Sequence, residues 1–102
     1  IGALLMGIPD ESGLRYAGRV GTGFTEKELA SLKERLEPLH REESPFSAPL
    51  SAVEAKDVQF VEPVLVGEVR YGDRTPGGIL KHSSWRGLRP DKSVDDVELD
   101  LG

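Results

Sequence analysis

The sequence predicts a mainly β domain, a small barrel of strands with a single helix inserted among them. Three observations support this prediction. Residues 1–21 hold two strand-like segments joined by turn formers, residues 24–39 change to a helical period, and two alternating segments follow in residues 60–88. Since a chain of 102 residues can bury one modest core, we expect residues 1–102 to form one domain.

The N-terminal segments predict a β-hairpin. Residues 1–8 are apolar with small glycines, which suits a strand buried on both faces, and the turn formers of residues 9–13 end it. Residues 14–21 alternate. One face would carry Leu14, Tyr16, Gly18 and Val20. Arg15 and Arg19 fall together on the other face, which we expect to be exposed.

The segment from Phe24 to Leu39 predicts an amphipathic helix. Its leucines repeat every three or four positions and form one stripe: Leu29, Leu32, Leu36 and Leu39. Thr25 and Glu28 have the spacing of a capping box, and Phe24 with Leu29 that of a hydrophobic staple. Pro38 is expected to close the helix.

The remaining order of elements resembles an OB-fold, a Greek-key barrel with one α-helix between its third and fourth strands. Residues 40–57 predict a mobile surface connection, residues 60–71 a strand, residues 73–78 a turn and residues 79–88 another strand. On this resemblance one strand is missing. We expect it to be the first strand, lying before Ile1 in a longer polypeptide from which this chain is cut.

Charge is unevenly distributed along the chain. The net charge of -5 argues against a uniformly basic nucleic-acid binder. Residues 70–92, however, contain six cations against two acids, and residues 93–102 then form an acidic tail. The chain has no cysteine, which fits a reducing cytoplasm, and its longest apolar run, residues 1–8, is too short to cross a membrane.

The sharpest local pattern lies in Trp85–Lys92. Arg89 and Lys92 combine a planar fork with a compact point charge, which suits a polyphosphate, and Asp91 could orient either cation or form a local salt bridge. The simpler alternative is a solvated, charged end of a strand.

Two motifs resemble a known family. Residues 80–92 resemble the last motif of covalent nucleotidyltransferases, the Arg-x-Asp-Lys signature of DNA ligases and mRNA capping enzymes. Residues 16–25 are similar to the Gly-Thr-Gly-Phe loop and helix start of ATP-dependent DNA ligase OB domains, closest to bacterial end-joining ligases of the ligase D type. With the strand at residues 66–69, the resemblance covers almost the whole chain. Ser83 and Ser84 depart from the family pattern, which puts any role of these two serines in doubt.

The resemblance implies a division of labour between domains. A nucleotidyltransferase domain of the same polypeptide would supply the lysine that attacks ATP, in a Lys-x-Asp-Gly motif that this chain lacks. The chain alone should be inactive. Arg89 and Lys92 would bind the β- and γ-phosphates, with Asp91 beside them, while a Mg²⁺ or Mn²⁺ ion would be bound mainly by the other domain. The implied partners are nicked double-stranded DNA and end-joining proteins, at the nucleoid of a bacterial cytoplasm.

Several residues are expected to contact DNA in such a ligase: Arg15, Arg19, Gly21, Thr22, Gly23, Lys81 and Arg86. For the glycine loop, a tight turn is the simpler account. Trp85 could stack on a base, but a barrel aromatic is the preferred interpretation. His40 and His82 are isolated, so no metal site is expected. Two alternatives remain open, a capping-enzyme OB domain and a stand-alone module that binds single-stranded nucleic acid.

Overall fold

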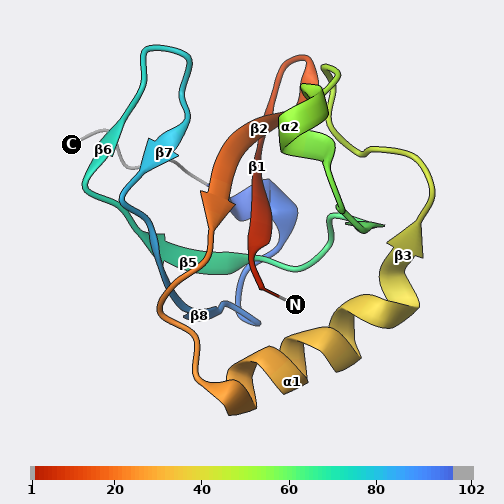
Figure 1. Cartoon of the computed structure of the whole chain (residues 1–102), viewed down its shortest axis with the longest axis vertical. Helices are drawn as coiled ribbons and strands as arrows, with labels where there is room; N and C mark the ends of the chain where they lie inside the picture. The colour runs from red at the N-terminus through yellow and green to blue at the C-terminus, as the bar shows by residue number, and fades with distance from the viewer. Residues whose placement is uncertain (1, 98–102) are drawn as a thin grey trace.

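The computed structural model describes residues 2–97, which form antiparallel strand pairs with one long helix lying along one side of them (Figure 1). The ladders of the described residues pair β1 with β2, β3 with β4, β5 with β8 and β6 with β7. The strands are β1 (Leu4–Asp10), β2 (Gly13–Val20), β3 (His40–Arg41), β4 (Phe60–Val61), β5 (Gly67–Arg70), β6 (Asp73–Arg74), β7 (Leu80–Lys81) and β8 (Ser84–Leu88). The helices are α1 (Glu26–Leu36) and α2 (Ala52–Ala55), with 3-10 turns at Glu37–Leu39 and Val94–Asp96.

The predicted N-terminal hairpin is confirmed, but its faces differ from the prediction. A register shift between Met6 and Gly7 leaves Ala17 of β2 without a partner, as in a β-bulge. Arg15 pairs with Ile8 and Arg19 with Leu5, and these partners are an odd number of residues apart. The two arginines therefore lie on opposite faces, and the prediction of one shared exposed face is wrong. Strand β1, which was expected to be buried on both faces, is only partly buried along its length.

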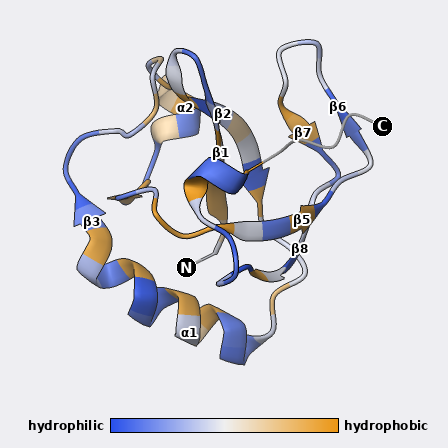
Figure 2. Cartoon of the chain, turned by 180° about the vertical axis from the view of Figure 1, so that it is seen from behind, coloured by the Kyte–Doolittle hydropathy of each residue, from blue (hydrophilic) through white to orange (hydrophobic). Residues whose placement is uncertain are grey.

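Helix α1 begins as predicted and ends earlier. Both hydrogen bonds of the capping box form, from the Glu28 backbone N–H to the Thr25 hydroxyl at 3.1 Å and from the Thr25 N–H to the Glu28 carboxylate at 3.1 Å. The α-helix stops at Leu36, and the turn that contains Pro38 is a 3-10 helix. Figure 2 shows hydrophobic and hydrophilic residues alternating along α1, with Leu32 buried in the core.

The connection after α1 contains more structure than predicted. His40 and Arg41 form the short strand β3, which pairs with Val61 and Phe60 of β4. Helix α2 lies within the same connection and has its own capping box, formed by Ser51 and Glu54. The long strand predicted over residues 60–71 is divided into β4 and β5, with a turn at Pro63 between them.

The second predicted long strand, residues 79–88, is also divided. His82 has a φ of 56°, a left-handed conformation that separates β7 from β8. Strand β8 then pairs with β5, and a second register shift places Glu68 opposite Gly87 and Val69 opposite Trp85. Arg86 is therefore the unpaired residue of a bulge and is exposed.

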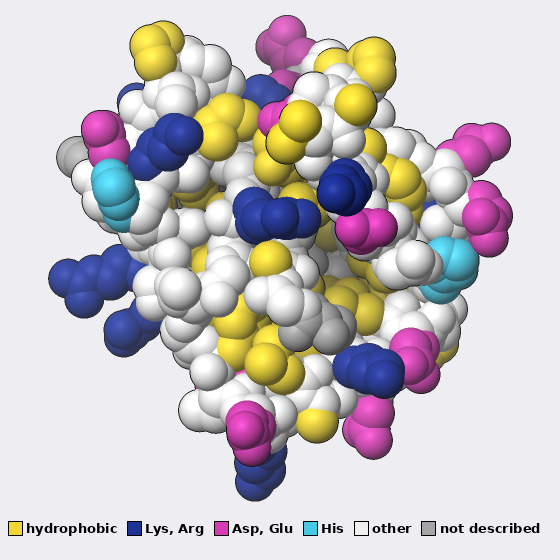
Figure 3. Space-filling view, in the orientation of Figure 1, with side chains coloured by type: hydrophobic (Ala, Val, Ile, Leu, Met, Phe, Trp, Pro, Cys, Tyr) yellow, Lys and Arg dark blue, Asp and Glu magenta, His cyan; other side chains and the backbone are white. Residues whose placement is uncertain are grey.

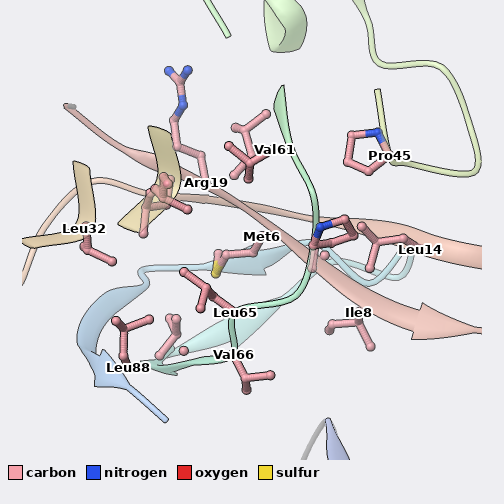
Figure 4. Close-up of a pocket in the computed structure, with 18 of the residues that line it drawn as sticks. Met6, Ile8, Leu14, Arg19, Leu32, Pro45, Val61, Leu65, Val66 and Leu88 are labelled. Carbon is pink, nitrogen blue, oxygen red and sulfur yellow. The ribbon is translucent and has the colours of Figure 1, made fainter. Parts of the chain in front are cut away.

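The core is small and lies beside a large apolar cleft. The described hydrophobic residues that are buried are Ala17, Val20, Leu32, Leu80 and Trp85. Next to them runs a cleft of about 1740 Å³, bordered by α1, β1, β5 and β8. Figure 4 shows the side chains of Met6, Leu65 and Leu88 gathered in this cleft. Many apolar side chains are therefore only half-buried.

Backbone hydrogen bonds outside the ladders join the strands to the loops and connections between them. Ser47 donates to Leu14 at 2.8 Å, which ties the long connection to β2, and Trp85 donates to Thr22 at 2.8 Å, which ties β8 to the loop before α1. Arg89 donates to Val66 at 2.7 Å, which extends the β5–β8 contact beyond the ladder. Among residues 2–97, β1 pairs with β2 alone, so no ladder closes a full barrel in this part of the chain.

Candidate phosphate-binding site

The end of β8 places Arg89 between two carboxylates from different parts of the chain. Asp91, two residues further on, accepts hydrogen bonds from Arg89 Nε at 3.1 Å and Nη2 at 2.9 Å. Glu68 on β5 accepts one from Arg89 Nη1 at 2.9 Å. The predicted local salt bridge of Asp91 is confirmed. These three bonds use three of the five guanidinium N–H donors, which leaves two for a further acceptor.

These contacts change the titration of both partners. The hydrogen-bonded carboxylate of Asp91, with a smaller contribution from Glu68, raises the pKa of Arg89 above its usual value. The same bonds from Arg89 lower the pKa of Asp91 below its usual range. At neutral pH the site therefore holds a fixed cation that is bound to a fully ionised carboxylate.

Lys92 adds a second cation next to this cluster. The turn that carries Lys92 is closed by a hydrogen bond from the Lys92 N–H to the Arg89 carbonyl at 3.1 Å. Lys92 is exposed, and together with Arg89 and Glu68 it borders the apolar cleft. The predicted trio of Arg89, Asp91 and Lys92 is thus brought together in space, on one side of the β5–β8 ladder.

The glycine loop between β2 and α1 packs directly on β8. The Thr22 hydroxyl donates to the Ser83 carbonyl at 3.1 Å, and a Cβ at Gly23 would lie 2.5 Å from the Trp85 carbonyl oxygen. Gly23 also has a φ of +91°. These contacts support the tight-turn interpretation of Gly23, while Gly21 remains exposed. Contact of Gly21, Thr22 and Gly23 with DNA stays a prediction.

The other predicted cations do not form one group. Arg19 and Lys81 border a small polar pocket of about 440 Å³, together with Tyr16 and His82. Arg15 lies apart, because it donates to the Gly78 carbonyl at 2.9 Å and ties β2 to the loop between β6 and β7. Figure 3 shows basic side chains projecting on the side of β5 to β8, whereas acidic side chains gather over β3 and α1.

Trp85 is part of the core, as the preferred interpretation expected. Only 7% of the residue is exposed, and its ring stacks on Phe24 with centroids 5.4 Å apart. Its far edge lies over Gly67, where a Cβ would be 2.3 Å from the indole. Trp85 is therefore not available to stack on a base.

Two features of the site were not predicted from the sequence. Glu68 was not predicted as a partner of Arg89, because the two residues are 21 positions apart and meet only through the β5–β8 register. The left-handed conformation of His82, next to Lys81, was also not predicted, because the spacing of residues does not indicate it.

Among residues 2–97, no group of three or more His, Cys, Asp or Glu side chains could hold a metal ion. No described helix is long and apolar enough to span a membrane.

The fold and this site define an OB domain that presents the Arg-x-Asp-Lys motif of nucleotidyltransferases. The family model "ATP dependent DNA ligase C terminal region" matches residues 1–92. The chain therefore belongs to the C-terminal region of ATP-dependent DNA ligases, as an OB domain of the ligase D type. This membership favours a DNA ligase domain over an OB domain of the capping-enzyme type.

Several relatives are named as multifunctional non-homologous end joining proteins, and this chain spans only a small part of their length. The multifunctional non-homologous end joining protein LigD of Mycolicibacterium smegmatis is 64% identical over 97 residues, which cover 95% of this chain and 13% of that protein. The crystal structure of the ligase domain of Mycobacterium tuberculosis LigD superposes with a TM-score of 0.94 at 60% identity, covering 97% of this chain and 32% of that chain. A mycobacterial DNA ligase D complexed with ATP and MES gives a TM-score of 0.88 at 61% identity, covering 95% of this chain and 32% of that chain. These matches confirm the predicted fold class.

Proposed function

We propose that this domain closes over ATP during self-adenylylation of a DNA ligase and then contacts nicked duplex DNA during sealing. The observation that carries the first role is the Arg89–Asp91 pair with Lys92 beside it. Asp91 holds the guanidinium by two bonds, Glu68 by one, and Lys92 beside them is exposed, so two N–H donors of Arg89 and the Lys92 ammonium remain to bind an anion. A solved relative is complexed with ATP, which supports a nucleotide as the ligand.

In this proposal, Arg89 and Lys92 bind the β- and γ-phosphates. They stabilise the negative charge that develops on the departing pyrophosphate and align it with the attacking lysine of the nucleotidyltransferase domain. Asp91 orients Arg89. A Mg²⁺ or Mn²⁺ ion would be held mainly by that other domain, since the described carboxylates of this site are already bound to Arg89.

The DNA-binding role belongs to a different set of cations. Arg19 and Lys81 border the same polar pocket, and Arg86 projects from the bulge of β8. Exposed cations of this kind bind phosphates without reading sequence. Arg15 is the weakest candidate, because its guanidinium is already bound to the Gly78 carbonyl. We place this activity in end joining at the nucleoid of a bacterial cytoplasm, by analogy with the LigD relatives.

The test separates the two steps of the reaction. In a ligase that joins this domain to a nucleotidyltransferase domain, Arg89→Ala or Lys92→Ala should slow self-adenylylation by roughly tenfold or more, because each change removes charge-assisted hydrogen bonds to the phosphates. Sealing of a pre-adenylylated nick should be largely unaffected. Single-turnover assays with radiolabelled ATP and with a pre-adenylylated nick measure the two rates.

Arg41→Ala is the matched control, because Arg41 is an arginine of similar exposure that pairs with Glu62 away from the site. It should leave both rates unchanged. Equal loss of both steps in Arg89→Ala would contradict the proposed role.

A further inference from the structure

We propose that Glu68 is a displaceable partner of Arg89, which occupies the guanidinium until the nucleotide phosphates replace it. In this scheme Glu68 acts only through Arg89 and touches no substrate. The inference rests on the proposed function, because it concerns the same arginine. It adds a residue on β5 that the Arg-x-Asp-Lys motif does not contain.

The two carboxylates hold Arg89 unequally. Asp91 accepts two bonds, at 3.1 Å from Nε and at 2.9 Å from Nη2, and lies only two residues from Arg89. Glu68 accepts one bond, from Nη1 at 2.9 Å, and comes from a different strand. An incoming anion that displaces Glu68 breaks one hydrogen bond, whereas displacing Asp91 would break two. Glu68 is therefore the partner that leaves first.

Charge balance gives the displacement a driving force. Arg89 and Lys92 carry two positive charges, and Asp91 with Glu68 carries two negative charges, so these four groups balance. Asp96 lies close enough to interact with both Lys92 and Asp91 and adds a further negative charge. A polyphosphate gains little attraction from a cluster without net positive charge, and its oxygens are repelled by the Glu68 carboxylate. When Glu68 moves away, the net charge that faces the ligand becomes more positive by one.

The surroundings of Glu68 allow this movement. The side chains of Arg89 and Glu68 are 35% and 53% exposed, so their ion pair is solvated and breaks at little cost. Glu68 pairs with Gly87 across the ladder, and a Cβ at Gly87 would meet no atom within 4 Å. Space therefore exists next to the pair for an anion to approach.

The backbone around the pair is fixed, so the exchange involves side chains alone. The β5–β8 ladder aligns Glu68 with Gly87, and the Arg89 N–H donates to the Val66 carbonyl at 2.7 Å. Arg89 thus stays within reach of both the Glu68 carboxylate and an incoming phosphate. The β5–β8 pairing keeps Glu68 at a constant position beside Arg89 when no phosphate is bound.

The experiment compares Glu68→Gln with Glu62→Gln in a ligase that joins this domain to a nucleotidyltransferase domain. Glu62 is a matched control, since it also pairs with an arginine 21 residues away and is 52% exposed. We expect Glu68→Gln to lower the apparent KM for ATP in adenylylation by roughly twofold to fivefold, the size of a lost exposed ion pair, with kcat not reduced. Glu62→Gln should change neither value.

A raised KM or a reduced kcat in Glu68→Gln would overturn the inference, because it would show that Glu68 holds Arg89 in its working position. An unchanged KM would overturn it as well. Glu68→Asp keeps the charge but withdraws the carboxylate by one methylene, so its KM should lie between those of the wild type and Glu68→Gln. Thermal melting should show that all three variants fold like the wild type.

A second measurement needs no enzymatic activity. Titration of the chain with inorganic tripolyphosphate, followed by the Arg89 Nε–H NMR signal, should give tighter binding for Glu68→Gln than for the wild type. The outcome for Arg89→Ala separates the two proposals. If Arg89→Ala adenylylates normally, the proposed function fails. If Arg89→Ala is impaired while Glu68→Gln gains nothing, only the role of Glu68 fails.

Discussion

Single residues of this domain are constrained most where the backbone of one segment touches that of another. Gly23 combines a φ of +91° with contact to Trp85, and Gly67 leaves room for the Trp85 ring. Neither constraint is visible in the local pattern, although Gly23 belongs to a recognisable turn motif. Both glycines fix how closely α1 and β5 approach β8.

Replacing Gly23 with Ala should destabilise the domain by at least about 2 kcal/mol. The new Cβ would require a left-handed residue with a side chain and would also clash with the backbone of β8. Gly21→Ala is the control in the same loop, since its Cβ would make only ordinary contacts at 3.7 Å. Urea unfolding measures both changes. A similar free energy of unfolding for the two variants would refute this account of Gly23.

The residue-level predictions from sequence succeeded where the partners are local. The Arg89–Asp91 bridge was foreseen as one option because the two residues are two positions apart. The partnership with Glu68 depends on a bulged register, and so does the orientation of Arg15 relative to Arg19. A bulge adds one residue to one strand, and alternation in a single strand carries no sign of it.

Among the elements, α1 was the easiest to predict. Its cap, its apolar stripe and its proline terminator all lie within sixteen residues and depend on local hydrogen bonds. The strands after it were harder. The alternation of residues 60–71 predicted one strand, although Pro63, which cannot donate to a ladder, lies where that strand is interrupted. The left-handed conformation of His82 has no comparable residue type to mark it.

The cap of α1 can be tested directly. Thr25→Ala should lower the free energy of unfolding by about 1 kcal/mol, because the Glu28 backbone N–H loses its acceptor. Thr25→Ser keeps the hydroxyl and should remain within a few tenths of a kcal/mol of the wild type. Chemical denaturation gives both values. Equal losses in the two variants would show that the methyl group, and not the hydrogen bond, matters at this position.

At the scale of the whole molecule, few of the described side chains are buried, and residues 70–92 carry six of the cations. Among residues 2–97, the buried cluster consists of Val20, Leu32 and Trp85, while the cleft beside it leaves other apolar side chains accessible. The sequence predicted a modest core and a basic segment before an acidic tail. Of that tail, Asp95 and Asp96 are described, whereas residues 98–102, like Ile1 and any strand before it, lie outside the described residues.

The lowered pKa values of two carboxylates predict how the free energy of unfolding depends on pH. Hydrogen bonds from Arg89 lower the pKa of Asp91, and the Ser12 hydroxyl lowers that of Asp10. A carboxylate with a lowered folded-state pKa contributes stability above its unfolded value of about 3.9, and this contribution is lost as the pH falls through the lower folded value. The free energy of unfolding should therefore be steady near neutral pH and decrease below about pH 4.

Asp10→Asn should make this acid decrease shallower, because one of the linked carboxylates is gone. Thermal melts between pH 7 and pH 2 measure the effect. An identical slope in the wild type and Asp10→Asn would count against the assignment to Asp10.

The enclosed position of Trp85 has a further consequence for experiments on this domain. Trp85 is the single tryptophan of the chain, and its backbone N–H is bound to the loop that precedes α1. Its indole stacks on Phe24 and lies four residues before Arg89 in the same stretch of chain. Its fluorescence is thus an intrinsic optical reporter of the contact between helix and ladder. Stopped-flow emission from this one ring can time the folding of the domain without any added label.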